Sequence, residues 1–124
     1  MNFPAAVKSC FSKYANFSGR ASRSEYWYFQ LFIHVVLAIL VVMVPIEPDT
    51  ATAVGIASCA FYLFIWLPSL AAAVRRLHDR NRSGWHYLWV LVPFFGGIVV
   101  LIWLCQGGVE GENRFGPDPL ATVE

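Results

Sequence analysis

The sequence predicts an all-α integral membrane protein with three hydrophobic segments and an N-terminal amphipathic helix. Residues 26–44, 51–74 and 85–107 contain no Asp, Glu, Lys or Arg. At about 1.5 Å per helical residue, each segment is long enough to cross a hydrocarbon core of roughly 30 Å. Only 14% of the residues are charged, whereas soluble domains carry about 25%. The 124 residues therefore predict a single membrane domain, residues 1–124.

Residues 1–25 form a polar segment that precedes the first hydrophobic one. Its apolar side chains recur at nearly helical spacing and would share one face of a short helix: Phe3, Val7, Cys10, Phe11, Tyr14 and Phe17. Such a helix can lie on the cytoplasmic leaflet with its apolar face in the lipid. It can equally pack against the cytoplasmic side of the helix bundle. The sequence leaves both interpretations open.

Positive charge is concentrated at two of the polar connections. Residues 1–25 carry four cations and one acid, and residues 75–84 carry four arginines and one acid. The connection between the first two segments has only Glu47 and Asp49 as charged residues. Short loops rich in Lys and Arg remain on the cytoplasmic side. We therefore predict a cytoplasmic N-terminus, a cytoplasmic 75–84 loop and an external turn at residues 45–50.

The first hydrophobic segment, residues 26–44, begins at a recognisable helix start. Ser22 and Glu25 have the spacing of a capping box, in which each side chain bonds the backbone N–H of the other residue. Further along, Gln30 and His34 lie one turn apart on one helix face. Polar side chains within a membrane normally face protein or water. We expect these two to form hydrogen bonds between helices rather than to bind a ligand.

Prolines divide the other two hydrophobic segments. Pro68 falls within residues 51–74, where it can kink the helix. The third segment, residues 85–107, is interrupted by Pro93 and by glycines at positions 96 and 97. It is either one kinked span or a re-entrant hairpin of two half-helices. The net negative charge of residues 108–124 favours the span, which would place that tail outside, although acidic residues influence topology only weakly.

The arginine-rich connection after the second segment is the main candidate for a binding surface. If the helix continues beyond residue 74, then Arg75, His78, Asp79 and Arg82 share one face. Guanidinium groups match phosphate oxygens bidentately, and anionic headgroups concentrate at the cytoplasmic leaflet. The predicted surface for an anionic headgroup or a partner comprises Arg20, Arg23, Arg75, Arg76, His78, Asp79 and Arg82. The alternative is an orienting loop whose arginines form ion pairs with Asp79 and Glu25.

The polar tail, residues 108–124, is rich in turn-forming residues. Asn113, Gly116 and the prolines at 117 and 119 favour a fixed irregular conformation over a helix. Arg114 and Phe115 are candidates to anchor it on the bundle. If the third segment re-enters, the tail meets the arginine loop, and Asp118 or Glu112 can pair with the arginines.

Enzymatic, metal-binding and nucleic-acid-binding functions have little support in the sequence. His78 and Asp79 are adjacent, so on a helix they diverge by about 100° and do not converge on a metal. The sequence contains no glycine-rich phosphate loop, zincin motif or nucleophile elbow. We predict no catalytic residue, metal site or cofactor, and no nucleic-acid partner. The three cysteines form no disulfide framework.

Three motifs occur in order around the hydrophobic segments. They are GRASRSEYW at residues 19–27, RRLHDRNRSGW at 75–85 and GENRFGPDP at 111–119. Together they resemble a bacterial family of small inner-membrane proteins called domain of unknown function 805, and the resemblance extends from about Tyr14 to Pro119. Arg80 and His86 depart from the family's usual residues. The resemblance implies the bacterial inner (plasma) membrane and implies no established activity.

We therefore expect a multi-pass, non-enzymatic inner-membrane protein. Its expected partners are membrane lipids, anionic phospholipid in particular, or a protein bound at the arginine surface. Two other classes of function remain open. The chain can be a subunit of an oligomeric transporter or channel, with Gln30 and His34 lining a path, or an assembly factor that acts by helix packing. A homo-oligomer or a membrane-protein partner is compatible with each class.

Overall fold

A computed structural model describes residues 2–42 and 48–121 of the chain. The elements, in order, are α1 (Phe3–Ser12), α2 (Arg23–Val42), α3 (Pro48–Asp79), the 3-10 helix η1 (Gly84–Leu91) and α4 (Gly96–Cys105). No β-strand occurs in the described part, where only an isolated bridge joins Asn113 to Gly116. The all-helical prediction is thereby confirmed for these residues.

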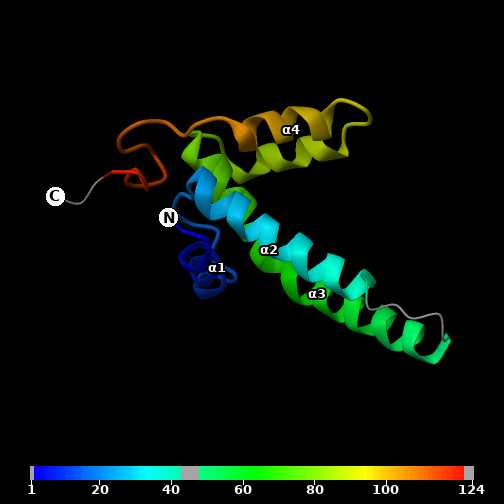
Figure 1. Cartoon of the computed structure of the whole chain (residues 1–124). Helices are drawn as coiled ribbons and strands as arrows, with labels where there is room; N and C mark the ends of the chain where they lie inside the picture. Colours follow the sequence, from blue (N-terminus) through cyan, green and yellow to red (C-terminus); the bar gives the residue numbers. More distant parts are fainter. Residues whose placement is uncertain (1, 43–47, 122–124) are drawn as a thin grey trace.

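Helices α2 and α3 form a long antiparallel hairpin (Figure 1). Their 20 and 32 residues correspond to lengths of about 30 and 48 Å. Both are long and apolar enough to cross a membrane, yet only 22% of the most apolar stretch of α2 and 11% of that of α3 are buried. The core helix of a soluble protein would be mostly buried. The exposed apolar surface is consistent with a lipid environment.

Residues 45–47 of the predicted external turn fall outside the described residues, as do residues 43 and 44 at the end of the first hydrophobic segment. The last residues of the predicted turn, 48–50, belong to the first turn of α3, where Pro48 occupies the first position. Proline is favoured there because the first N–H of a helix has no intrahelical partner. At the other end, α3 continues through the buried Pro68 to Asp79, five residues beyond the hydrophobic segment.

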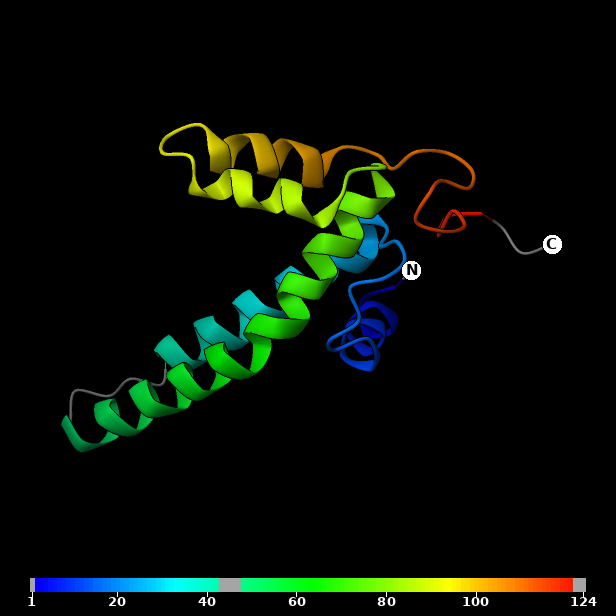
Figure 2. The same ribbon diagram turned by 180° about the vertical axis from the view of Figure 1, so that it is seen from behind.

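The third hydrophobic segment is a hairpin and not a single span. Helices η1 and α4 run antiparallel, and their turn lies away from the rest of the molecule (Figure 2). The Asp79 carbonyl accepts a hydrogen bond from Val109 N–H at 2.8 Å, so both ends of the segment lie beside the end of α3. The spanning interpretation is therefore wrong for this structure, and the tail returns to the side on which α3 ends.

The turn of this second hairpin depends on a close backbone approach. A Cβ atom on Gly96 would lie 1.5 Å from the carbonyl oxygen of Trp89, a distance that no side chain tolerates. Phe94, within the turn, has a φ of 68° and is 90% exposed. The interruption at residues 93–97 thus reverses the chain, and charge distribution gave no indication of this.

Helix α1 packs on the bundle, which settles the choice between its two predicted positions. Phe11 makes edge-on contacts with Phe29 and Phe32 of α2, at 5.5 and 5.8 Å between ring centroids. Cys10 is fully buried beneath this contact. The figures show α1 beside the N-terminal half of α2 (Figure 1). Asn2 caps the helix by accepting a hydrogen bond from Ala5 N–H at 3.0 Å.

Candidate functional site at the helix junction

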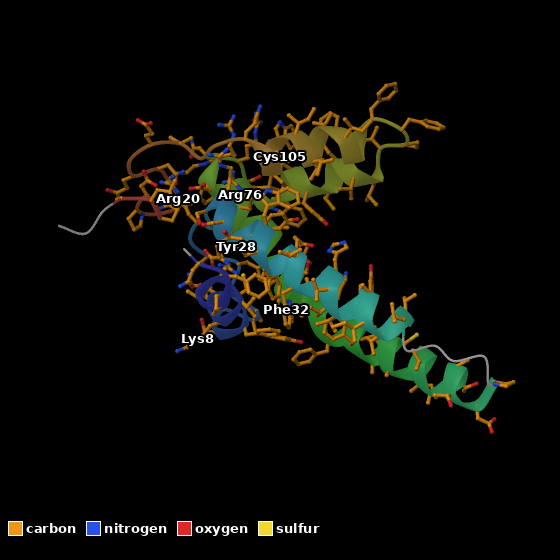
Figure 3. The ribbon with its side chains drawn as sticks, viewed as in Figure 1. Lys8, Arg20, Tyr28, Phe32, Arg76 and Cys105 are labelled. Carbon is orange, nitrogen blue, oxygen red and sulfur yellow. The ribbon has the colours of Figure 1, made fainter. Side chains whose placement is uncertain are left out.

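The N-terminal end of α2, the end of α3, the loop 13–22 and the tail 106–119 meet at one place, called here the junction. Both hairpins extend from it (Figure 2). Its interior is charged, and each of these side chains is at most 6% exposed: Arg20, Glu25, Arg75, Arg76 and Asp79. Arg20 and Arg76 both lie in this region, between the helices and the tail (Figure 3). Charged residues are almost never fully buried unless they are paired.

Asp79, at the end of α3, forms the centre of the first ion-pair group. Its Oδ1 accepts from Nε of Arg20 at 3.0 Å, and its Oδ2 accepts from Nη1 of Arg76 at 2.5 Å. The carboxylate therefore joins the loop before α2 to α3 itself. Arg76 is three residues before Asp79, which is a spacing at which helical side chains meet. Within the described residues, Asp79 is thus the one carboxylate that contacts both buried cations at 3.0 Å or less.

The remaining donors of these two arginines bind backbone carbonyls of the third segment and the tail. Arg76 Nε donates to Leu104 O at 3.1 Å, and its Nη2 donates to Gln106 O. Arg20 Nη1 donates to Gly111 O at 2.6 Å, and its Nη2 donates to Val109 O. These carbonyls follow or end α4 and have no partner within the helix. The two guanidinium groups thus hold the second hairpin and the tail against α3.

Glu25, in the first turn of α2, forms the second ion-pair group. Its Oε1 accepts from Arg75 Nη1 at 2.8 Å and from Ser9 Oγ at 2.8 Å, and Lys13 Nζ lies 3.9 Å away. Burial, aided by the charge of Glu25, raises the pKa of the nearby Cys10 thiol to about 11. The thiol is therefore protonated at neutral pH, as expected for a buried free cysteine.

Only half of the predicted capping box forms. Ser22 Oγ accepts from the backbone N–H of Glu25 at 3.3 Å, as predicted. The Glu25 carboxylate instead binds Arg75 and Ser9. The reason is electrostatic, because a buried guanidinium without a carboxylate would cost more free energy than an unsatisfied N–H at a helix end.

His78 connects α3 to the tail. Its Nδ1 lies 2.9 Å from the Gly19 carbonyl oxygen, and its ring stacks on Phe115 at 3.9 Å with an interplanar angle of 3°. Asn113 Nδ2 donates to the His78 carbonyl oxygen at 2.9 Å. Asp118 lies 4.0 Å from Arg20. The expected anchoring of the tail through Phe115, and the expected pairing of Asp118 with an arginine, are both confirmed.

The structure places most residues of the predicted arginine surface in the interior. Arg20, Arg75, Arg76 and Asp79 lie inside the junction rather than on a face, because the returning third segment and tail cover them. The alternative of ion pairs with Asp79 and Glu25 is the one that the structure shows. Arg23 is exposed and Arg82 is half-buried. Of the seven predicted residues, these two alone present a guanidinium group outside the ion pairs.

Arg82 lies against α4, and its neighbour Arg80 contacts the chain just after that helix. The guanidinium carbon of Arg82 lies 4.4 Å from the Trp103 ring centroid, in cation–π geometry. Arg80 Nη1 donates to Gly107 O at 2.8 Å. Nε of each arginine has no hydrogen-bond partner within the described residues. Arg80 was not among the predicted site residues, because its contact with Gly107 depends on the return of the η1–α4 hairpin.

The tail contributes a further residue that sequence reasoning missed. A Cβ atom on Gly108 would lie 2.1 Å from Oδ2 of Asp79, so only glycine lets the tail backbone approach this carboxylate. The signal available in the sequence was the adjacent pair of glycines at positions 107 and 108. It could not identify which one packs against the junction.

Of the polar pair within the first hydrophobic segment, Gln30 forms the expected hydrogen bond between helices and His34 does not. Gln30 Nε2 donates to Ser69 Oγ of α3 at 3.1 Å. His34 Nδ1 lies 2.6 Å from the backbone carbonyl oxygen of Gln30. One bond joins α2 to α3, and the other lies within α2. His34 itself is exposed.

Comparison with known proteins matches residues 14–117 to the family described as "Protein of unknown function (DUF805)". The chain is 43% identical over 111 residues to the inner membrane protein YhaI of Escherichia coli K12, covering 90% of this chain and 92% of that protein. It is 41% identical over 108 residues to inner membrane protein YhaH of the same strain, covering 86% and 88%. It is 26% identical over 128 residues to the uncharacterized protein YiiR.

No solved structure matches the chain. The family match covers most of the sequence and confirms the resemblance drawn from the three motifs. This chain belongs to the DUF805 family, and its relatives YhaI and YhaH are inner membrane proteins by name.

Proposed function

We propose that this protein is a non-enzymatic, multi-pass inner-membrane module that binds anionic phospholipid headgroups at its cytoplasmic end. The guanidinium groups outside the buried ion pairs would make the contacts, chiefly those of Arg82 and Arg80. Arg23, the first residue of α2, would be a further contact. The N-terminus and the junction would face the cytoplasm. The names of the relatives support the inner membrane as the location.

Charge and helix length support this orientation. Nine Lys and Arg residues occur in the chain, and all of them lie in α1, the junction, the tail or their connections. Such a distribution is typical of the cytoplasmic side. The α2–α3 hairpin would then cross the bilayer from the junction. Helix α4, of 10 residues, is about 15 Å long, so the η1–α4 hairpin would enter only the cytoplasmic leaflet.

The observation that carries the proposal is the difference between Arg82 and the buried arginines. Arg20, Arg75 and Arg76 each have a carboxylate within 3.0 Å. Arg82 has a tryptophan face at 4.4 Å and forms no ion pair within the described part of the chain. Tryptophan favours the headgroup region, so a guanidinium held over it would lie at the depth of lipid phosphates. A phosphate would supply the counter-charge that Arg82 does not find among the described residues.

The test compares arginine with lysine at matched positions. Purified protein in a neutral detergent is heated with short-chain phosphatidylglycerol, phosphatidylcholine or inorganic phosphate, at constant salt. We expect phosphatidylglycerol alone to raise the unfolding temperature of the wild type. Arg82→Lys and Arg80→Lys should lose most of this shift, because ammonium cannot reproduce the guanidinium fork.

Arg114→Lys is the matched control, because Arg114 is exposed on the tail and contacts Phe115. Its lipid response should equal that of the wild type. Equal responses from all four proteins would overturn the proposed headgroup site, and an equal effect of inorganic phosphate would show a simple anion effect.

A further inference from the structure

The two hairpins enclose a cavity between them, apart from the junction and from the arginines discussed above. It has a volume of about 290 Å³ and is lined by all three neighbouring helices. Its polar or aromatic lining residues are Gln30 and His34 of α2, Tyr62, Trp66 and Ser69 of α3, and Tyr87 of η1. Residues from both hairpins therefore form one site, which no feature of a single helix predicts.

This cavity lies well below the junction. His34 is about 16 Å along α2 from Arg23, at 1.5 Å per residue. In the orientation proposed above, this depth is within the hydrocarbon core, where water is scarce. Polar groups at such depth are costly unless they meet a partner. A phosphate group would have to lose its hydration to reach them, so an uncharged head is required.

The hydrogen bond of His34 determines which partner it needs. A backbone carbonyl can only accept, so the 2.6 Å contact with Gln30 O requires that Nδ1 carry the proton. In the neutral ring Nε2 is then an acceptor. The His34 side chain is exposed toward the cavity. A ligand that satisfies Nε2 must therefore present a hydroxyl or another neutral donor.

The remaining lining favours a flat aromatic head on an apolar tail. Tyr62 and Trp66 are 59% and 57% exposed, and with Tyr87 they provide aromatic walls and two phenolic hydroxyls. A second cavity, of about 460 Å³, shares Leu70 and Tyr87 with the first and is lined mainly by apolar side chains. An apolar tail can extend into it or into the surrounding lipid.

We propose that the cavity between the hairpins binds the ring of a membrane-dissolved quinol, with one quinol hydroxyl donating to His34 Nε2. The other ring oxygen would meet the tyrosine hydroxyls of Tyr62 or Tyr87. The reduced form binds better than the quinone, because a quinone carbonyl offers His34 no proton. The proposal concerns binding only and includes no electron transfer. It uses the membrane orientation proposed above but not the headgroup site.

The experiment measures binding of three probes to the purified full chain in neutral detergent: decylubiquinol, decylubiquinone and dioctanoylglycerol. We expect saturable binding of the quinol, and weaker binding of the quinone and of the neutral lipid alcohol. His34→Phe should weaken quinol binding by roughly five- to tenfold, as expected for a lost hydrogen bond, and should abolish the preference for quinol over quinone.

Tyr87→Phe and Tyr62→Phe retain the rings and remove only the hydroxyls, so they keep the test independent of folding. At least one of them should weaken quinol binding severalfold. Tyr28→Phe is the matched control, because Tyr28 lies on the side of α2 that contacts α1 through Phe3. Its affinity should equal that of the wild type. The Arg82→Lys and Arg80→Lys variants should also bind quinol with the affinity of the wild type, which separates this site from the headgroup site.

Three results would overturn the proposal. They are quinol uptake that does not saturate, a quinol affinity no greater than that for dioctanoylglycerol, and equal quinol affinities of wild type and His34→Phe. An unchanged lipid response in the arginine variants, together with saturable and His34-dependent quinol binding, would overturn the headgroup site and leave this inference standing.

Discussion

The junction buries charged side chains, whereas the two hairpins that extend from it expose apolar ones. The junction encloses Arg75 and Arg76 with no exposed surface, whereas Leu63 of α3 is 77% exposed and Phe94 at the hairpin turn is 90% exposed. In water this arrangement would be unstable. In lipid, apolar surface gains little by leaving the solvent, because lipid tails are as apolar as leucine.

The comparison indicates where the specificity of this fold originates. The apolar faces of the hairpins determine the depth at which the helices lie, but they distinguish poorly between a neighbouring helix and lipid. Hydrogen bonds and ion pairs do distinguish, because an unpaired buried charge costs several kcal/mol. Arg20, Arg76 and Asp79 therefore decide which segments meet, and the following changes test this division between the two regions.

Asp79→Asn should have the largest effect. The substitution preserves the shape of the side chain but leaves Arg76 buried without a counter-charge and Arg20 with only Asp118 at 4.0 Å. Removal of one partner of a buried ion pair typically costs about 3–5 kcal/mol. The measurement is the free energy of unfolding in detergent. Leu63→Ala, on the exposed face of α3, should cost no more than about 0.5 kcal/mol. Comparable losses from both variants would contradict the contrast between junction and hairpins.

Gly108→Ala should have the next largest effect. Its Cβ would lie 2.1 Å from Asp79 Oδ2, whereas a Cβ on Gly107 meets nothing within 4 Å. Overpacking of this kind costs about 1–3 kcal/mol. Thermal unfolding of the two alanine variants side by side checks the prediction. If Gly107→Ala is as destabilising as Gly108→Ala, the close packing of the tail on Asp79 is not what stabilises the junction.

Ser22→Ala should weaken the protein by about 1 kcal/mol, since the hydroxyl caps α2 by accepting from Glu25 N–H at 3.3 Å. Ser58→Ala is a suitable control within the hairpin, because Ser58 is only half-buried and lies 21 residues before the end of α3 at Asp79. The free energy of unfolding of both variants gives the comparison. A silent Ser22→Ala would mean that the ion pair of Glu25, and not the cap, fixes the start of the helix.

The smallest expected effect is a pH dependence of the tail. The backbone N–H groups of Leu120 and Gly111, together with Arg20, hold the pKa of Asp118 below its ordinary value of 3.8. A lowered pKa in the folded state adds stability that is complete above pH 3.8 and is lost as the pH falls through the folded value. Acid should therefore loosen the tail without opening the hairpins.

Hydrogen exchange at the Gly111 amide, compared between wild type and Asp118→Asn, measures this effect. The wild type should be more protected at neutral pH, and the difference should disappear in acid. Glu112→Gln serves as the control, since Glu112 is exposed. A difference that persists unchanged in strong acid would show that the Asp118 charge does not hold the tail.

Much of the local structure followed from the sequence alone. Charge-free runs identified the long helices α2 and α3, and the Ser22 cap marked the start of α2 to within one residue. The three motifs around these runs identified the family. These features are readable because they depend on composition and on spacing within one helix, where the backbone geometry is already known.

The arrangement of the segments did not follow from the sequence. The hydropathy of residues 85–107 does not show whether this segment spans the membrane or forms a hairpin. The Pro–Gly interruption permits both, and the acidic tail influences topology only weakly. The hairpin is instead stabilised by contacts between residues distant in the sequence, such as the hydrogen bonds of Arg76 to the carbonyl oxygens of Leu104 and Gln106.

The placement of the arginines depended on the same hairpin. By sequence, Arg75 and Arg76 belong to a surface, and the tertiary structure encloses them because the third segment and the tail fold back over the end of α3. The sequence alone determined that these charges lie between the hydrophobic segments and not within them. Only the tertiary structure decided that Arg20, Arg75 and Arg76 bind the chain itself while Arg82 remains outside the ion pairs, because burial and pairing depend on which segments pack together.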